Sequence, residues 1–311
     1  MISIIITSWN EPKTIYRCIS SIGNTEYSRI DNDFEIIQLS PDDETLKEGL
    51  KAAHDIKLGN RYIQIKDPKK GKPYALKMAF KIAKGDIIII TDGDTYCDEN
   101  AIKYLLEPFE NKNIGATSGR PISLNSKNNF WGYVSNLLTD AADHRRKSTM
   151  SIKNKEYYIS DSTFFPVSGY LMAYRNVIGD IPENVLSDDG YISYAIRNKG
   201  YKVAYTPLAR VNVKFPTSFS DYLKQKVRSM GGFIQIKRMG IMQKDKQSRS
   251  LLIELGNTLY ALTYARTAKE LLYSVGLFPV RLYTWFLISL NQYVLKKGMP
   301  KGGWERIEST K

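Results

Sequence analysis

Cysteine and histidine are rare in this sequence. Its 311 residues include two cysteines, Cys18 and Cys97, and two histidines, His54 and His144. Because the cysteines lie far apart and in no metal-binding spacing, they exclude a disulfide-stapled scaffold and fit a reducing compartment. Two histidines argue against a histidine-based zinc centre. A hydrophobic share of 42% is ample for a sizeable core and excludes a disordered protein.

The sequence also lacks a secretory signal, low-complexity tracts and internal repeats. Met1 leads directly into the apolar segment Ile2–Thr7, without a basic stretch before it or a small-residue cleavage site after it. Acidic residues are in deficit, since 45 Lys and Arg against 32 Asp and Glu give a net charge of +13. This charge favours an anionic partner such as a nucleotide, a lipid headgroup or a nucleic acid. No recognisable nucleic-acid-binding motif accompanies it, so we expect no nucleic-acid partner.

The first half of the chain alternates strand-like and helix-like segments, as βαβ units do. Strands are expected at Ile2–Thr7, Phe34–Leu39, Tyr62–Ile65, Ile87–Ile90 and Ala116–Ser118. Helices are expected at Glu11–Ile22, Glu44–Ala53, Lys72–Ala83 and Asn100–Phe109. We therefore predict an α/β fold built on a three-layer, mostly parallel sheet of the nucleotide-binding type.

The pattern changes after residue 130. A polar, basic helix is expected from Trp131 to about Ser160, and its basic run at 144–147 is interpreted as a solvated face rather than a dedicated binding site. Beyond it we expect strand, helix and strand in turn, at Phe164–Tyr174, Tyr191–Asn198 and Tyr201–Tyr205.

The C-terminal region is rich in leucine and aromatic residues. Leu251–Ala265 and Leu271–Leu290 read as helices, but Pro279 and Arg281 interrupt the second. Because a spanning helix needs about 20 largely uncharged residues, we expect interfacial or re-entrant helices rather than a transmembrane span. The aromatic and basic flanks of such an anchor would be Tyr283, Trp285, Tyr293, Lys296 and Lys297. The alternative is a helical pair packed on the catalytic core or in a dimer.

Two aspartates follow the most apolar strand. Ile87–Ile90 is β-branched throughout, which suits a strand buried on both faces, and Thr91 then leads into Asp92-Gly93-Asp94. Open α/β sheets place their ligands at the carboxyl ends of such strands. Carboxylates there are suitable ligands for Mg²⁺ or Mn²⁺, which also binds substrate phosphates. The alternative is a simple Asp-Gly turn.

Several separated segments appear in one order. They are Thr7-Ser8-Trp9-Asn10-Glu11, Lys70-Gly71-Lys72-Pro73-Tyr74-Ala75-Leu76, Asp92-Gly93-Asp94, Ser187-Asp188-Asp189 and Gln225-Lys226-Val227-Arg228. Over about residues 1–235 this series resembles the inverting family-2 glycosyltransferases of the GT-A fold. The resemblance implies a catalytic domain at 1–235, a C-terminal helical extension at 236–311, a nucleotide-sugar donor such as a UDP-sugar, and Mn²⁺ or Mg²⁺ as cofactor.

The resemblance also assigns roles to the carboxylates. It implies that Asp94 holds the metal and that Asp92 binds near it, beside the ribose or the donor sugar. It implies that Asp189 is the general base, with Asp188 in the preceding acidic position. A base is required because the acceptor hydroxyl loses a proton as it attacks. Without the other segments, Ser187 and the two aspartates would be read as the N-terminal cap of a helix.

The same resemblance gives candidate ligand-binding residues. For the nucleotide-sugar they are Thr7, Trp9, Glu11, Asp42, Lys72, Asp92, Gly93, Gln225 and Arg228. Ser168 and Gly169 are expected near the acceptor and the donor sugar. A solvent-facing side chain is an equally open reading for Lys72. Ser229 stands where processive members have a tryptophan, which argues against a polymerase.

The leading hypothesis is a metal-dependent inverting glycosyltransferase at the cytoplasmic face of the membrane, peripheral to it, acting on a lipid-linked or glycan acceptor. A soluble enzyme that modifies a protein or a small acceptor is the first alternative. A nucleotidyltransferase is the second, although the segment after the first strand lacks its glycine-rich, basic loop.

Overall fold

The computed structural model describes residues 1–30, 33–153, 157–160, 164–242, 258–290 and 307–310. Within these residues, ten strands form one sheet. In chain order they are β1 (Ile2–Thr7), β2 (Phe34–Ser40), β3 (Tyr62–Lys66), β4 (Ile87–Asp92), β5 (Thr95–Cys97), β6 (Ile114–Ser123), β7 (Ser151–Lys153), β8 (Tyr157–Ile159), β9 (Leu171–Arg175) and β10 (Lys202–Val213).

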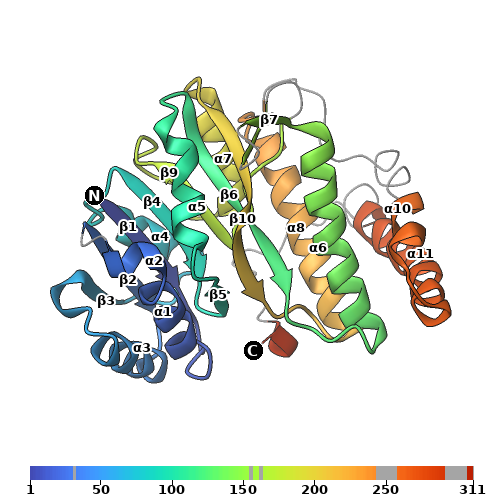
Figure 1. Ribbon diagram of the computed structural model, residues 1–311, viewed down its shortest axis with the longest axis horizontal. Helices are drawn as coiled ribbons and strands as arrows, with labels where there is room; N and C mark the ends of the chain where they lie inside the picture. Colours follow the sequence, from blue (N-terminus) through green and yellow to red (C-terminus); the bar gives the residue numbers. More distant parts are fainter. Residues whose placement is uncertain (31–32, 154–156, 161–163, 243–257, 291–306, 311) are drawn as a thin grey trace.

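Helices cover both faces of the sheet and extend beyond one side of it (Figure 1). The α-helices are α1 (Ile15–Gly23), α2 (Glu26–Ile30), α3 (Asp43–Asp55), α4 (Lys72–Phe80), α5 (Ala101–Leu106), α6 (Phe130–Thr149), α7 (Asp188–Asn198), α8 (Phe219–Arg238), α10 (Thr258–Tyr264) and α11 (Ala268–Ser289). Short 3₁₀ turns are η1 (Gly59–Arg61), η2 (Glu107–Glu110) and η4 (Glu308–Thr310). The predicted α/β class is confirmed.

The sheet is parallel in its first half and mixed in its second. Its order is β3-β2-β1-β4-β9-β6-β10-β8-β7, and β5 pairs with β10. The pairs β3–β2, β2–β1 and β1–β4 are parallel, but β9 is antiparallel to both β4 and β6. Beyond β4 the expected parallel arrangement holds only in part, because β9 is antiparallel to both of its neighbours whereas β6 and β10 are parallel. The reason is that β9 begins at Leu171 opposite Thr91, at the carboxyl end of β4, and so must run back along it.

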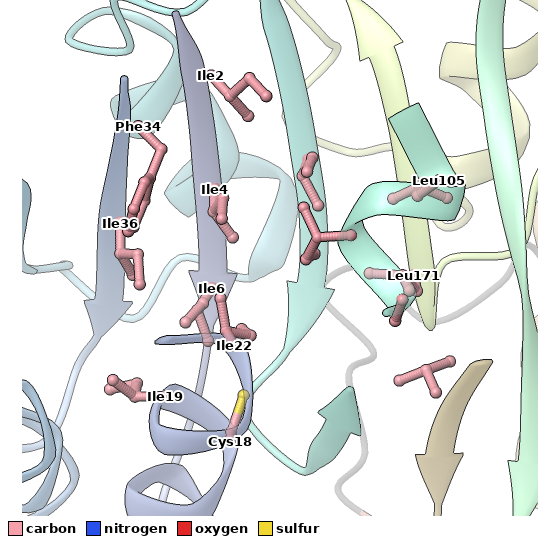
Figure 2. Packing of buried hydrophobic residues seen from close by; sticks show 14 of the residues in the cluster. Ile2, Ile4, Ile6, Cys18, Ile19, Ile22, Phe34, Ile36, Leu105 and Leu171 are labelled. Atoms are coloured by element: carbon pink, nitrogen blue, oxygen red, sulfur yellow. The ribbon is translucent and has the colours of Figure 1, made fainter. Parts of the chain in front are cut away.

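The apolar residues of β1, β2 and β4 alternate between two cores. Figure 2 shows one of them, in which Ile4 and Ile6 of β1 meet Ile19 and Ile22 of α1. The other core lies on the opposite face, where α4 packs on β1 and β2 and α7 packs on β6 and β10. A strand that is apolar throughout is needed for this arrangement, because both of its faces are buried. The expected three-layer arrangement follows from it.

Several predicted elements have different bounds, and β10 continues to Val213 where the expected strand ended at Tyr205. The first helix begins at Ile15 rather than Glu11. The basic helix α6 ends at Thr149, and the short strands β7 and β8 follow, with β8 pairing to β10. The segment 164–170 is not strand, because its backbone N–H groups bond to side chains instead of a neighbouring strand. The N–H groups of Val167, Ser168 and Gly169 donate to Ser193, Ser118 and Asp189 respectively.

The basic run of α6 packs against aromatic rings. His144 stacks on Tyr260 with a centroid separation of 4.6 Å, and the Arg146 guanidinium lies 5.0 Å from the Tyr205 ring centroid. Lys147 pairs with Asp143 at 2.9 Å. These contacts with α10 and β10 are structural, and the reading of this run as a purely solvated face is incomplete.

Helix α11 lies at one end of the molecule, beside α6 and α8 (Figure 1). Its inner face buries Ser274, Leu277 and Thr284. Its outer face exposes large apolar side chains, namely Leu271, Leu272, Val275, Leu282, Tyr283 and Phe286. No helix in the described part of the chain has the length and apolar character needed to cross a bilayer. The expected anchor residues Tyr293, Lys296 and Lys297, and the first part of Leu251–Ala265 (251–257), lie outside the described residues.

Candidate active site

The candidate site forms where β1 and β4 end. These strands run parallel with Thr7 opposite Asp92, so their carboxyl ends lie side by side. The Thr7 hydroxyl donates a hydrogen bond to Asp92 Oδ1 at 3.3 Å. The predicted aspartate motif thus leaves the sheet at its carboxyl edge, where open α/β sheets bind ligands.

Lys72 joins the two acidic motifs. It is the first residue of α4, and its ammonium group lies 2.7 Å from Asp92 Oδ1 and 3.1 Å from Asp188 Oδ2. Its side chain is 9% exposed and that of Asp188 is 7% exposed, so this bridge is largely removed from solvent. Lys72 therefore faces the site and not the solvent, and it brings the end of β4 together with the start of α7.

The charges of this bridge depend on one another. Burial alone would lower the pKa of Lys72, but the charges of Asp188 and Asp92 outweigh it, and the pKa is raised. Burial raises the pKa of Asp188, with Asp189 and Asp92 acting in the same direction and Lys72 opposing them. A buried carboxylate is stable in its charged form only with such a partner. Asp188 thus forms a buried ion pair with Lys72.

Asp189 is held differently from its neighbour. Its Oδ1 accepts hydrogen bonds from the Ser187 hydroxyl and from the Gly190 N–H, the latter at 2.7 Å. Its Oδ2 accepts from the Gly169 N–H at 3.1 Å. These donors fix the orientation of the Asp189 carboxylate at the N-terminus of α7. Ser187 also caps α7, so capping and site geometry coexist.

Two glycines allow α7 and α8 to approach closely. A Cβ atom on Gly190 would lie 2.7 Å from Ile236 Cδ1, and one on Gly232 would lie 2.6 Å from Ser187 Cβ. These distances are shorter than real side chains tolerate. The pair of helices thus holds Ser187 and Asp189 in place from behind.

The loop after β4 packs on Glu11. A Cβ atom at Gly93 would lie 2.4 Å from Glu11 Oε2 and 2.7 Å from Ser8 Cβ, so only glycine fits between the two motifs. Glu11 is buried, and its N–H donates to Thr45 Oγ1 at 2.8 Å. The segments Thr7–Glu11 and Asp92–Asp94 therefore form one continuous wall.

Asp42 connects the loops that follow β1 and β2. It caps α3 through Thr45 N–H at 2.9 Å and accepts the Asn10 N–H at 2.6 Å. Burial acts to raise the pKa of Asp42, but these hydrogen bonds outweigh it and the pKa is lowered. Beside it, the Lys69 ammonium lies 5.2 Å from the Trp9 ring centroid. Asp42 has a structural role whether or not it also reads a base.

Gln225 contacts the site through Tyr170, a residue absent from the predicted set. Gln225 Nε2 donates to the Tyr170 hydroxyl at 3.3 Å. Burial raises the pKa of Tyr170; the Arg228 charge opposes this, and the charges of Asp94, Asp92 and Asp189 reinforce it. Tyr170 directly follows Ser168-Gly169, which was the one sequence signal that pointed to it.

The two motif aspartates suit a divalent cation. In the described part of the chain, no three His, Cys, Asp or Glu side chains gather closely enough to hold a metal by themselves. Mg²⁺ and similar ions need no such group, because they are commonly held by one or two carboxylates together with substrate phosphates and water. Asp92 and Asp94 at the end of β4 offer that donor set.

Comparison with known proteins agrees with this geometry. Residues 1–232 match a family model described as Glycosyltransferase like family 2. The poly-beta-1,6-N-acetyl-D-glucosamine synthase of Staphylococcus aureus (strain COL) is 25% identical over 235 residues. That of Staphylococcus epidermidis (strain ATCC 35984) is 26% identical over 236 residues. Each alignment covers 74% of this chain and 54% of the relative, so the chain spans about half the length of these curated relatives.

Solved structures share the fold. A mannosyltransferase of Pyrobaculum calidifontis, in complex with GDP-Man and Mn²⁺, has a TM-score of 0.61 at 17% identity, covering 95% of this chain and 88% of that one. GalNAc-T7, with UDP, GalNAc and Mn²⁺, has a TM-score of 0.54 at 17% identity, covering 95% and 57%. At these identities the likeness establishes a GT-A fold. The chain therefore belongs to the family of the model that it matches, Glycosyltransferase like family 2.

Proposed function

We propose that this protein is an inverting glycosyltransferase that moves a sugar from a UDP-sugar to an acceptor hydroxyl by direct displacement. The observation that carries the proposal is the Lys72 bridge between Asp92 and Asp188. This bridge joins the end of β4, which carries the proposed donor-binding motif, to the start of α7, which carries the proposed base Asp189. The proposal assigns catalysis to residues 1–235 and contact with a membrane to residues 236–311.

Asp189 would remove the proton from the acceptor hydroxyl. Inversion requires the acceptor to attack from the face opposite the leaving diphosphate, so the base must lie on the acceptor side of the sugar. The turn at Ser168 and Gly169 borders Asp189 and would face the acceptor and the donor sugar. Asp188 is an unsuitable base because its carboxylate is buried against Lys72.

The diphosphate would lie between β4 and α8. Negative charge grows on the leaving phosphate as the glycosidic bond breaks, and fixed positive charge stabilises it. Asp92 and Asp94 would hold Mn²⁺ or Mg²⁺, which supplies part of that positive charge when bound. Arg228 supplies a guanidinium from α8, and guanidinium geometry suits phosphate oxygens. Thr7, Trp9, Glu11, Asp42 and Gly93 would form the nucleoside end.

The acceptor is proposed to be a growing glycan or a lipid-linked glycan. The curated relatives carry the name of a polysaccharide synthase, which supports a glycan acceptor. The outer face of α11 supports a peripheral position at the cytoplasmic face of a membrane, because Leu272 and Leu282 are 71% and 69% exposed there. Exposed apolar surface of this kind is typical of interaction sites.

A panel of nucleotide-sugars tests the donor assignment. Thermal unfolding is measured with UDP-, GDP-, ADP- and CMP-linked sugars, each with and without Mn²⁺. A ligand of the native state raises the melting temperature by mass action, so we expect a Mn²⁺-dependent rise with UDP-sugars. A rise in melting temperature with sugars linked to another nucleotide alone would show that the donor is not a UDP-sugar. If no nucleotide-sugar raises the melting temperature, the isolated chain has no functional donor site and the proposal is contradicted.

A further inference from the structure

Tyr170 lies where the separate parts of the site meet. It occupies the position between Gly169 and the first residue of β9. Its carbonyl oxygen accepts a hydrogen bond from Thr91 Oγ1 at 2.7 Å, immediately before Asp92. The N–H of Gly169 donates to Asp189. The main chain around Tyr170 is therefore fixed between the end of β4 and the start of α7.

The side chain of Tyr170 is fixed as well. Its ring packs edge-on against Phe215, with centroids 5.5 Å apart and an interplanar angle of 68°. Its hydroxyl oxygen accepts a hydrogen bond from Gln225 Nε2 at 3.3 Å. A phenol can accept and donate at the same time. Among the residues that the structure describes, none accepts a hydrogen bond from this hydroxyl, so its proton is available to a ligand.

The charges around the hydroxyl define what that ligand can be. Burial raises the pKa of Tyr170, so the phenol stays protonated at neutral pH. The charges of Arg228, Asp94, Asp92 and Asp189 all act on this hydroxyl: Arg228 opposes the effect of burial on its pKa, and the three carboxylates reinforce it. A neutral hydrogen-bond donor whose electrostatic surroundings include a guanidinium and two candidate metal-binding carboxylates suits an anionic oxygen, which the guanidinium and a cation held by the carboxylates would also attract.

We infer that the Tyr170 hydroxyl binds the diphosphate of the donor, donating its hydrogen bond to a phosphate oxygen. This inference rests on the nucleotide-sugar donor proposed above. The contact strengthens as negative charge grows on the leaving phosphate, because hydrogen bonds to charged oxygens are the stronger kind. Gln225 then acts through Tyr170, by orienting the hydroxyl that touches the donor.

The test is the substitution Tyr170→Phe, which keeps the ring and its contact with Phe215 and removes only the hydroxyl. Binding of UDP with Mn²⁺ and of uridine alone is measured by calorimetry, and transfer by initial rates. We expect the UDP dissociation constant to rise about tenfold or more, with a comparable fall in kcat/KM, and uridine binding to stay unchanged. The matched control is Tyr133→Phe on α6, which removes a hydroxyl bonded to Ser274 at 2.7 Å, and it should change neither.

The outcomes separate this inference from the proposed function. Wild-type binding of UDP, together with unchanged binding and transfer in Tyr170→Phe, overturns the role of Tyr170 and leaves the proposed function intact. Equal weakening of UDP and uridine indicates a general disturbance of the pocket and also overturns it. If the wild-type protein binds no UDP in the presence of Mn²⁺, the proposed donor is wrong and the inference falls with it.

Discussion

Adjacent aspartates in this site have different surroundings. Asp188 is buried and paired with Lys72, whereas Asp189 accepts hydrogen bonds from Ser187, Gly190 and Gly169. The two carboxylates therefore differ as candidate general bases, because a carboxylate that is paired with a buried cation is poorly suited to accept a proton. We therefore place base catalysis on Asp189 and a positioning role on Asp188.

The base assignment predicts different effects at two carboxylates. Asp189→Asn keeps the shape of the side chain, so we expect donor binding to be retained and transfer to fall about 10²-fold or more. Asp94→Ala should instead weaken Mn²⁺-dependent binding of the donor. Calorimetry and initial rates separate the two effects, with Asp55→Asn on the surface of α3 as control. Near-native transfer by Asp189→Asn would falsify the base assignment.

Lys72 gives a prediction on stability. Lys72→Met leaves Asp188 buried without its cation, which typically costs about 3–5 kcal/mol of unfolding free energy. Lys77 on the same helix makes comparable ion pairs, 3.2 Å from Asp180 and 3.1 Å from Glu183, but at the surface. Lys77→Met should therefore cost about 1 kcal/mol or less. Urea denaturation measures both variants, and equal losses would contradict a buried bridge.

At the scale of elements, the site depends on how closely α7 and α8 pack. Gly232→Ala would place a Cβ atom 2.6 Å from Ser187 Cβ, so α8 must move away from the start of α7. We expect a loss of about 1–3 kcal/mol in stability and a fall in transfer, because Gln225 on α8 and Asp189 on α7 shift relative to one another. Unfolding and initial rates are both measured.

A helical glycine elsewhere provides the control for Gly232. At Gly276 on α11, the nearest atom to an added Cβ is Phe130 Cε2 at 3.3 Å, the far end of a side chain. Gly276→Ala should leave transfer unchanged and raise or maintain stability, because alanine favours a helix over glycine by up to about 1 kcal/mol. Loss of transfer in both variants would show that helix packing in general, and not the α7–α8 contact, sets the activity.

Some helices and strands could be predicted from the sequence alone, and others could not. Buried strands and their following motifs are local patterns, so β1, β2, β3 and β4 were predicted nearly to their ends, whereas α1 begins later than expected and α2 was not predicted. The antiparallel entry of β9 was not, because strand direction depends on where the chain re-enters the sheet. The segment 164–170 was read as strand because its residues are apolar, whereas tertiary hydrogen bonds to Ser118, Asp189 and Ser193 shape it.

At the scale of the whole molecule, the active site and the apolar face of α11 are separate features. The site lies at the carboxyl edge of the sheet, while α11 lies beyond α6 at one end of the molecule (Figure 1). The outer residues Leu272, Val275, Pro279, Leu282 and Phe286 follow helical spacing along one side of α11. The net charge of +13 would add attraction to an anionic lipid surface.

The membrane proposal predicts a surface-specific loss. In the double variant Leu272→Glu, Leu282→Glu, binding to anionic phospholipid vesicles should fall by at least about tenfold, since burying one leucine contributes roughly 1.5–3 kcal/mol. Leu50→Glu is the control, because Leu50 is 56% exposed on α3 and outside the α11 face. Vesicle sedimentation measures binding. Absence of wild-type sedimentation would favour the enzyme acting away from membranes, on a protein or a small acceptor.

The sequence by itself determined the family, the order of the acidic motifs and the strands that present them, because these depend on residue type and local periodicity. Tertiary structure decided which of those residues cooperate. Lys72 was open to a solvent-facing reading until the fold brought Asp92 and Asp188 within 2.7 and 3.1 Å of it. Tyr170 belongs to no motif and is held in place by Thr91, Phe215 and Gln225, which are distant in the chain. Long-range packing brings such residues together, and short-range sequence patterns do not encode it.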